Sequence, residues 1–361
     1  MKNIEVNNNE YSIVFSRDII EISELLHNKN ILKNRSYFII DENVYNCHKK
    51  EVDFLIKNNT SNKPLILYIS ENEKNYRTIE KIYSYLIENN CTREGILVSI
   101  GGGVLGDLVG MVSATFMRGI KYINIPTTII SETDSSIGGK VAYNFNHLKN
   151  VIGAFYNPFL VIINVEFLKT LPERQFNNGI GEVIKYTLID KNQNLFKFFK
   201  LNKSKIKEKD SSTLEELIRR CLLIKKIYVE EDFKDNGLRN ILNFGHTIGH
   251  GIESDSEYSV LHGEAVALGI LVALKLSNKH YDNQFKFYEA IKSCIKYFDL
   301  PVDYKIKSKT SFIEAIKKDK KNDENIRFVL LKEIGNLVPK VIVSQEEIFC
   351  TIEETFKGEW L

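Results

Sequence analysis

The stretch GILVSIGGGVLGD, residues 95–107, decides the fold of the first half of the chain. An apolar run enters glycines that satisfy the pattern GxGxxG, and the apolar periodicity that follows predicts a helix. A strand that turns through glycines into a helix is typical of nucleotide-binding α/β domains, because the first helical amides can meet a pyrophosphate. The same turn also occurs in proteins that bind no nucleotide, so the motif alone leaves both interpretations open.

Short apolar runs on either side of this turn predict further strands. They are YSIVF (11–15), SYFII (36–40), PLILYI (64–69), YINI (122–125) and FLVIINV (159–165). Amphipathic segments such as residues 77–88 separate the runs. Strands that alternate with helices predict a largely parallel, Rossmann-like sheet with helices on its faces.

After Leu171 and Pro172 apolar residues recur at a spacing of three and four, which predicts helices. The expected helices cover residues 179–189, 214–229, 239–253, 262–279, 284–297, 311–318 and 345–356, and a hairpin is indicated by IRFVLL (326–331) and PKVIV (339–343). We therefore predict an α/β domain over residues 1–172 and an all-α domain over residues 173–361.

The composition is that of a globular protein. Of 361 residues, 43% are hydrophobic and 27% charged, and a net charge of +2 gives no reason to expect nucleic acid or a membrane surface as a partner. Five cysteines without CxxC spacing favour reduced thiols and a cytoplasmic location. The first residues have no signal-peptide pattern, and the longest apolar run, residues 265–274, is too short to span a bilayer.

Three of the seven histidines fall in NFGHTIGHGIESDSEYSVLHGE, residues 243–264. His246 and His250 are four residues apart, on one face of a predicted helix, and His262 follows a polar loop. Single histidines of this kind are often hydrogen-bonded core residues, but three together with flanking glycines favour a divalent metal site. Neither HExxH nor CxxC is present, so the spacing does not name the ion, and a carboxylate from elsewhere must complete the ligand set.

The segment GIGEVIKYTLI, residues 179–189, offers such a carboxylate. Glu182 and Lys185 lie three residues apart on an otherwise apolar helical segment. The spacing indicates a charged pair that faces a specific partner, although a simple intrahelical ion pair explains it as well.

Polar residues gather where the predicted strands end. Asp41 follows one strand and is placed to accept a ribose hydroxyl, although it precedes the glycines, whereas the acid of a standard Rossmann unit follows them. Thr127 and Thr128 end another strand, and residues 134–140 form a polar glycine loop of the kind found at ligand-binding sheet edges. Candidate anion contacts are Arg118, Lys140, Lys149 and Asn150, although each of them, taken singly, is more typical of an exposed surface group.

Nine motifs resemble, in order and spacing, the 3-dehydroquinate synthase family of sugar phosphate cyclases. They are GGGVLGDLVG, ATFMRG, IPTT, DSSIGGK, KNVIGAFYNP, LKTLPER, GEVIKY, GLRNILNFGHTIGHGIE and LHGEAVALG, and the match extends from about Asp41 to Gly335. The resemblance implies a dehydroquinate synthase-like fold, in which an N-terminal domain binds NAD and a helical C-terminal domain binds a catalytic zinc, with the active site in the cleft between them. Cobalt is an alternative ion.

The activity that this resemblance implies belongs to the shikimate pathway. It converts 3-deoxy-D-arabino-heptulosonate 7-phosphate to 3-dehydroquinate and phosphate, through NAD-dependent oxidation, phosphate elimination, reduction and intramolecular aldol cyclisation. NAD is regenerated in each turnover. The resemblance further implies a homodimer, because Arg118 would reach the substrate from a neighbouring subunit.

Site residues follow from the resemblance position by position. The metal ligands would be Glu182, His246 and His262. The substrate would contact Lys140, Asn150, Lys185, Lys225, Arg239, Asn243, Asp134, His250, Arg118 and the stretch Asp319, Lys320 and Lys321. NAD would contact Asp41, Asn43, Gly102, Gly103, Val104, Asp107, Thr127, Thr128, Lys149, Phe167 and Thr170.

Some positions depart from the family pattern. Asp235 stands where a glutamate is usual, Phe233 and Gln175 stand where acids are common, and Lys140 is followed by Val-Ala-Tyr. In residues 71–80 the register leaves open whether Glu73 or Lys74 is the nucleotide contact. Three alternatives remain: another sugar phosphate cyclase, a metal-dependent polyol dehydrogenase that releases NADH, and a nucleotide-binding scaffold without catalysis.

Overall fold

The computed structural model describes residues 3–6, 10–146, 148–281, 287–319 and 325–356. Its contacts divide the chain into two compact units. The first unit comprises Met1–Leu171 and Leu214–Phe233, and the second comprises Pro172–Thr213 and Lys234–Leu361. The segment 214–233, whose helical spacing placed it with the second half in the sequence, thus groups with the first unit.

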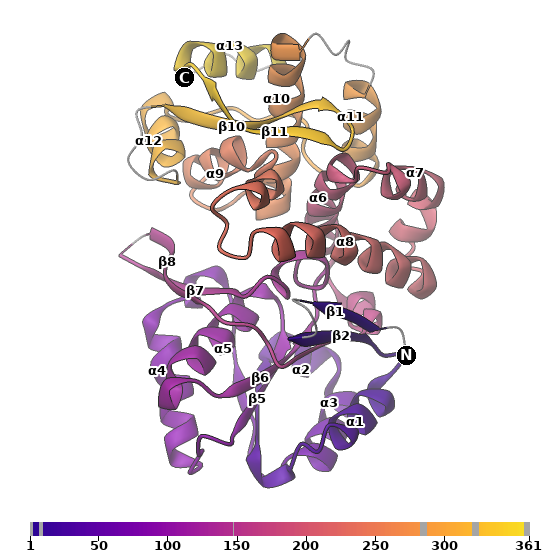
Figure 1. Ribbon diagram of the computed structural model, residues 1–361, viewed down its shortest axis with the longest axis vertical. Helices are drawn as coiled ribbons and strands as arrows, with labels where there is room; N and C mark the ends of the chain where they lie inside the picture. Colours follow the sequence, from indigo (N-terminus) through magenta and orange to yellow (C-terminus); the bar gives the residue numbers. More distant parts are fainter. Residues whose placement is uncertain (1–2, 7–9, 147, 282–286, 320–324, 357–361) are drawn as a thin grey trace. The chain divides into compact units, whose positions relative to one another are not determined.

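Among the described residues, seven strands form the main sheet of the first unit, in the order β1-β2-β9-β6-β5-β3-β4 (Figure 1). Their bounds are Asn3–Val6 (β1), Tyr11–Phe15 (β2), Leu160–Ile163 (β9), Lys121–Pro126 (β6), Ile96–Gly101 (β5), Ser36–Asp41 (β3) and Leu65–Leu67 (β4). β1 pairs with β2 in antiparallel register, and the other neighbouring pairs are parallel. The predicted largely parallel sheet is confirmed.

Helices cover both faces of this sheet (Figure 1). The elements are α1 (Ile19–Asn28), α2 (Glu42–Cys47), α3 (Lys49–Asn59), α4 (Tyr76–Glu88) and α5 (Gly103–Thr115). Successive side chains of β5 point to opposite faces, so Leu97 shares a core with Ile82 of α4, whereas Val98 shares a core with Ile22 of α1 and Leu55 of α3. This burial on both faces explains why the strands read as nearly continuous apolar runs.

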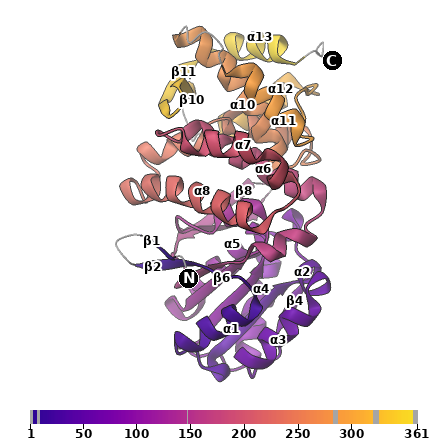
Figure 2. The same cartoon turned by 90° about the vertical axis from the view of Figure 1, so that its right-hand side faces the viewer.

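Two further elements complete the first unit. β7 (Lys140–Phe145) and β8 (Leu148–Phe155) form an antiparallel hairpin outside the main sheet, which the sequence did not predict. The long helix α8 (Ser211–Glu231) is seen side-on in Figure 2. Lys225 on this helix contacts Asp134, which lies in the short π-helical turn Ser131–Ser135. This contact joins α8 to the loop that follows β6.

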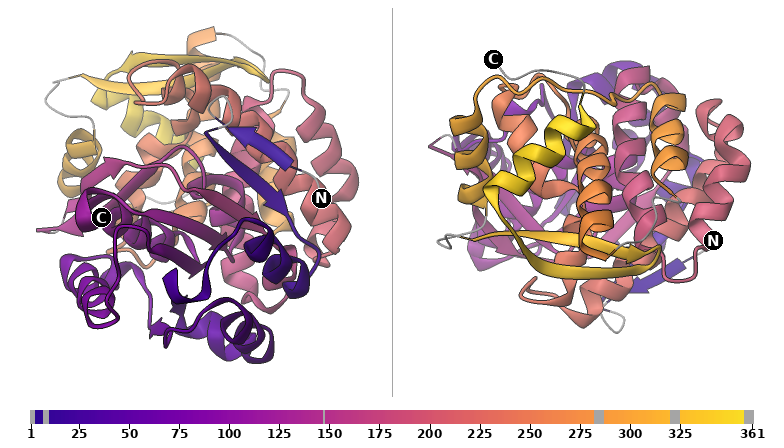
Figure 3. Two further views of the ribbon diagram at one scale, coloured as in Figure 1. Left: turned by 60° about the horizontal axis from the view of Figure 1, so that its bottom comes forward. Right: turned by 90° about the horizontal axis from the view of Figure 1, so that it is seen from above.

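The described part of the second unit is helical apart from one hairpin. Its helices are α6 (Glu173–Ile189), α7 (Asn194–Lys207), α9 (His246–Asp255), α10 (His262–Tyr281), α11 (Tyr288–Tyr297), α12 (Lys309–Asp319) and α13 (Gln345–Thr355). The hairpin β10 (Ile326–Glu333) and β11 (Asn336–Val343), indicated by the sequence, lies beside α10 (Figure 3). The unit is therefore mainly, but not entirely, α-helical.

The predicted helix over residues 239–253 is interrupted. A 3-10 turn covers Leu238–Asn243, and α9 begins only after Gly245, whose φ of 81° is in the left-handed region that favours glycine. A Cβ at Gly245 would also lie 2.8 Å from Ile270 Cγ1, so α9 and α10 approach closely here. Within the described segments, no helix has both the length and the hydropathy needed to cross a bilayer.

Candidate metal and nucleotide sites

Glu182 lies at the centre of α6, a helix whose residues from Phe176 to Ile189 are all buried. The Glu182 side chain is 0% exposed, and Lys185 one turn later is 1% exposed, with its Nζ 2.5 Å from Glu182 Oε2. Apart from this ion pair, neither carboxylate oxygen has a hydrogen-bond partner among the described residues. A buried carboxylate in this state requires further positive charge or donors.

Two histidine nitrogens face the same carboxylate oxygen. Nε2 of His246, the first residue of α9, lies 3.3 Å from Glu182 Oε1, and Nε2 of His262, the first residue of α10, lies 3.1 Å from it. Ligands about 2.1 Å from a tetrahedral zinc are about 3.4 Å apart, so these spacings fit one ion held by three protein ligands. A three-ligand set leaves the fourth position open, as a catalytic metal requires.

The other nitrogen of each histidine has an acceptor that orients the ring. His246 Nδ1 lies 3.3 Å from the Phe244 carbonyl oxygen, and His262 Nδ1 lies 3.3 Å from Glu253 Oε2. Protonation at Nδ1 leaves Nε2 of each ring free to bind an ion, the arrangement usual for metal-binding histidines. Glu253 was not predicted from the sequence, although it lies three residues after His250, on the same helical face.

The electrostatics of the cluster favour an anionic Glu182. Burial alone would raise the pKa of Glu182, but Lys185 and His246 outweigh burial and hold the pKa well below its usual range. Burial lowers the pKa of His246. For His262, burial is outweighed by Glu253 and Glu182, which raise the pKa to about 10. A divalent cation would satisfy the same negative charge, so the donor set fits the metal that the sequence predicts.

The remaining predicted residues of the second unit divide into three cases. His250 is half-buried, and its ring centroid lies 5.4 Å from that of His246 and 6.2 Å from that of His262. Arg239 is buried and Asn243 half-buried, both in the 3-10 turn before α9. Lys320 and Lys321 lie outside the described residues.

In the first unit, the glycine turn joins β5 to α5 as predicted. Gly102 is the residue before α5, and a Cβ there would lie 3.2 Å from Thr128 Cγ2. A Cβ at Gly101 would lie 3.1 Å from Asp41 Cβ. Since β3, β5 and β6 are parallel neighbours, Asp41, the glycines and Thr127 meet at one carboxyl edge of the sheet.

This edge has the features that a dinucleotide needs. The buried Thr127 Oγ1 has no hydrogen-bond partner among the described residues, and the first amides of α5 lie at a helix N-terminus. Asp41 accepts a hydrogen bond of 2.9 Å from the Asn43 amide at the start of α2. Phe167 and Thr170, in the 3-10 helix after β9, contact His48 at the end of α2. Val104 lies in the first turn of α5.

The candidate substrate contacts of the first unit lie on the hairpin, on α8 and in two short helical turns. Lys140 opens β7 with an exposed side chain, and Lys149 and Asn150 lie on β8. Lys225 Nζ is 2.7 Å from Asp134 Oδ1, a pairing that was not predicted from the sequence. Arg118 has a left-handed φ of 68°.

Of the two alternatives Glu73 and Lys74, Lys74 contacts two of the predicted site residues. It is 5% exposed, and its Nζ lies 2.6 Å from Asp107 Oδ2 and 2.5 Å from Asn150 Oδ1. The charge pattern of residues 71–74 could not separate the two residues, because both are charged and adjacent. Only the fold brings Lys74 to α5 and β8.

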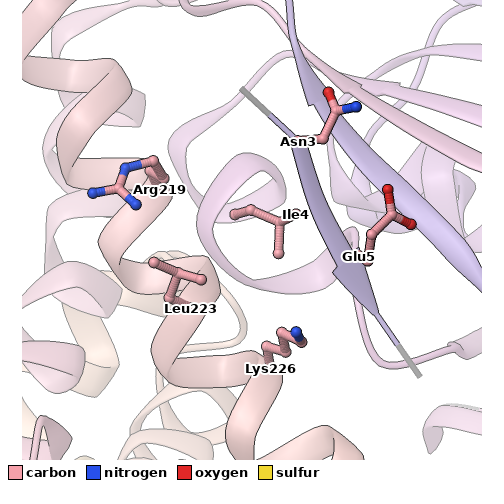
Figure 4. A pocket seen from close by; sticks show the side chains of 6 residues that line it. All are labelled: Asn3, Ile4, Glu5, Arg219, Leu223 and Lys226. Atoms are coloured by element: carbon pink, nitrogen blue, oxygen red, sulfur yellow. The ribbon is translucent and has the colours of Figure 1, made fainter. Parts of the chain in front are cut away.

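A separate cavity of about 380 Å³ lies between β1 and α8 (Figure 4). Its lining residues are Asn3, Ile4, Glu5, Arg219, Leu223 and Lys226. Arg219 is paired with Glu216 at 2.8 Å, and Glu5 accepts a hydrogen bond from Ser12. None of the predicted site residues lines this cavity, and it is not a candidate active site.

Two family models match consecutive parts of this chain. The family models described as 3-dehydroquinate synthase N-terminal and 3-dehydroquinate synthase C-terminal match residues 65–178 and 179–322. The chain belongs to the 3-dehydroquinate synthase family. A relative from Clostridium tetani named 3-dehydroquinate synthase is 45% identical over 357 residues, which cover 98% of this chain and 95% of the relative. The expectation drawn from the nine sequence motifs is thus confirmed at the level of the family.

Two solved structures share the fold of this chain. A 2-epi-5-epi-valiolone synthase from Streptomyces hygroscopicus subsp. jinggangensis, with NAD⁺ and Zn²⁺ bound, superposes with a TM-score of 0.86 at 23% identity, covering 98% of each chain. A 2-deoxy-scyllo-inosose synthase complexed with carbaglucose-6-phosphate, NAD⁺ and Co²⁺ superposes with a TM-score of 0.86 at 24% identity. The superposition covers 98% of this chain and 100% of the synthase chain. Both structures are less than 25% identical to this chain, so the likeness shows the fold alone.

Proposed function

We propose that the chain is a 3-dehydroquinate synthase, a phosphate-eliminating carbon–oxygen lyase that forms 3-dehydroquinate and phosphate from 3-deoxy-D-arabino-heptulosonate 7-phosphate. The observation that carries this proposal is the buried Glu182 carboxylate, which two histidine nitrogens approach within 3.3 Å. Membership of the family and 45% identity to a full-length relative support the same activity. The proposal includes a role for this enzyme in the shikimate pathway and a cytoplasmic location.

The proposed cofactors are NAD and zinc, with cobalt as a substitute ion. When bound, zinc supplies a Lewis acid that lowers the pKa of a substrate hydroxyl, and NAD accepts and returns a hydride. Glu182, His246 and His262 would hold the ion. NAD would lie along the carboxyl edge of β3, β5 and β6. Gly102 and Gly103, which have no side chains, would leave room for its pyrophosphate at the start of α5.

The chain's own side chains would orient the substrate and move a proton. His250 lies one turn beyond His246, and its ring centroid is 5.4 Å from that of His246, so we assign it the proton of the hydroxyl being oxidised. Lys185 and Arg239 are buried cations of the second unit, and burial strengthens their attraction for phosphate and carboxylate groups. Asn243, between Arg239 and α9, would bind the same anions.

In the first unit, we assign substrate contacts to the hairpin and the loop before it. Lys140 and Asn150 would bind anionic groups of the substrate. Asp134, which is paired with Lys225, would accept a hydrogen bond from a substrate hydroxyl. Lys149 would contact NAD. We also propose a homodimer in which Arg118 serves the neighbouring subunit. Lys320 and Lys321 are kept as proposed anion contacts on the family resemblance alone.

A coupled assay tests the proposed activity against the polyol dehydrogenase alternative. The enzyme is supplied with the heptulosonate phosphate and an amount of NAD far below that of substrate, and phosphate and nicotinamide absorbance are followed together. The cyclase releases phosphate until the substrate is consumed, with no net NADH. Phosphate release that stops when NAD is used up, or NADH that accumulates in proportion to product, would favour the dehydrogenase.

A further inference from the structure

Asn178 and Glu182 lie one turn apart on α6, and both contact the start of α10. The Asn178 side-chain oxygen accepts hydrogen bonds from the backbone amide of Gly263 at 2.6 Å and of Glu264 at 3.3 Å. One turn further along α6, Glu182 Oε1 lies 3.1 Å from Nε2 of His262. One face of α6 therefore provides both a cap for α10 and the carboxylate that faces the first residue of α10.

The first amides of any α-helix lack partners within the helix and need acceptors from outside. Here the acceptor is Asn178, 6% exposed, on a different helix and about 85 positions away in sequence. The Glu264 carboxylate serves the neighbouring Leu261 amide at 2.9 Å. Arg174, one turn before Asn178 on α6, holds that carboxylate at 2.7 Å and donates to the Ser259 carbonyl oxygen at 2.9 Å.

The two backbones touch at this point. A Cβ at Gly263 would lie 1.7 Å from the Asn178 carbonyl oxygen, and a Cβ at Gly181 would lie 2.1 Å from the Gly263 carbonyl oxygen. Glycine contact thus sets the distance between α6 and the first turn of α10. The direction in which that turn presents its side chains depends on the hydrogen bonds that hold it.

We propose that Asn178 is a positioning residue for the metal site. Its amide oxygen fixes the first turn of α10, and so directs the His262 imidazole toward Glu182 before an ion binds. Loss of a group that orients a metal ligand typically lowers metal affinity by about 10- to 100-fold. The inference rests on the proposed metal site, and deepens it by naming a residue that touches neither the ion nor the substrate.

Zinc titration of the metal-free protein against a competing chelator tests this role without measuring activity. Asn178→Ala is expected to weaken zinc binding by about 10- to 100-fold, whereas Asn178→Asp keeps an acceptor oxygen at the helix N-terminus and restores most of the affinity. Ser344→Ala is the matched control, because Ser344 Oγ accepts the Glu347 amide at the start of α13 in the same unit. That variant loses a helix cap and retains wild-type zinc affinity.

The outcomes separate this inference from the proposed function. Wild-type protein that binds no zinc would contradict the metal site itself. The role of Asn178 would be overturned if Asn178→Ala bound zinc as tightly as the wild type. It would also be overturned if Ser344→Ala lost as much zinc affinity as Asn178→Ala. Hydrogen exchange in metal-free wild-type protein gives a second measurement that does not depend on a variant folding: the Gly263 and Glu264 amides are expected to be protected, and rapid exchange at both would overturn the inference.

Discussion

Lys74 Nζ lies 2.6 Å from Asp107 Oδ2, and this ion pair joins the loop before α4 to the helix that follows the glycine turn. The same ammonium group lies 2.5 Å from Asn150 Oδ1 on β8. Burial raises the pKa of Asp107, and Lys74 opposes that rise. Three segments far apart in the sequence, around residues 74, 107 and 150, are therefore held by one buried cation.

Replacing this cation is expected to destabilise the protein. Lys74→Met keeps the length of the side chain but leaves Asp107 without its partner, which should lower the free energy of unfolding by about 3 kcal/mol. Lys49→Met is the control, because the Lys49 and Asp53 side chains are 59% and 47% exposed and their pairing contributes little. Urea denaturation of both variants measures the difference. Equal losses in the two variants would show that the Lys74–Asp107 pair contributes no more to the free energy of unfolding than an exposed pair.

Glu132 gives a prediction about pH. It is 0% exposed, neither carboxylate oxygen has a hydrogen-bond partner among the described residues, and burial raises its pKa well above the usual range. The folded state therefore holds this proton more tightly than the unfolded state, so the contribution of Glu132 to stability is greatest below the unfolded pKa and is lost as pH rises toward the folded pKa. Each pKa unit by which this shift extends costs about 1.4 kcal/mol.

Glu132→Gln is nearly isosteric and does not titrate. We expect the variant and the wild type to be similarly stable near pH 4, and the variant to be more stable at pH 7. The difference in their free energies of unfolding should grow as pH rises from 4 to 7. Thermal unfolding across this pH range measures it. A variant that is less stable than the wild type at every pH would mean that the Glu132 carboxylate has a partner that glutamine cannot replace.

His246 and His250 should respond differently to the same substitution. His246→Ala removes a proposed ligand and is expected to lower zinc content and turnover together, with the fold retained by the other apolar contacts of the second unit. His250→Ala should lower turnover by about 10²- to 10⁴-fold, because a general acid–base group is lost, while zinc content stays at the wild-type level. Elemental analysis beside the phosphate assay distinguishes the two. Loss of zinc from His250→Ala would place that residue among the ligands.

Lys140 is predicted to bind the substrate rather than the nucleotide. Lys140→Ala should weaken binding of the substrate and of a non-eliminable phosphonate analogue, and leave NAD affinity unchanged in calorimetric titrations. Lys121→Ala is the control, since Lys121 is exposed at the opposite, amino end of β6. A titration in which only NAD binding weakened would show that Lys140 belongs to the nucleotide site.

The elements predicted best from the sequence are those specified by local pattern. The run of residues 96–100 and the glycines after it predicted β5 and the start of α5, because apolar strands and glycine turns are encoded by adjacent residues. The hairpin of β7 and β8 was not predicted, since its residues mix lysine, asparagine and glycine, and five of the eight residues of β8 from Leu148 to Phe155 are exposed apolar or small residues without alternation.

The candidate site was only partly accessible from sequence for a similar reason. The number and spacing of His246, His250 and His262 indicated a metal site, and the family resemblance assigned His246 and His262, with Glu182, as its ligands. Asn178 gave no such signal, because an asparagine four residues before a glutamate is compatible with any helix surface. Which partner a helix has is likewise not encoded in its periodicity, so the predicted helix over residues 214–229 was assigned to the second half, although Leu214–Phe233 groups with the first unit.

The most direct test of the proposed metal centre is an anomalous-difference map from crystals of the zinc-loaded protein, recorded at the zinc absorption edge. We expect one strong peak about 2 Å from Glu182 Oε1 and from Nε2 of His246 and of His262. A strong peak bound by other residues, or zinc-loaded crystals in which these three side chains contact no peak, would contradict this expectation.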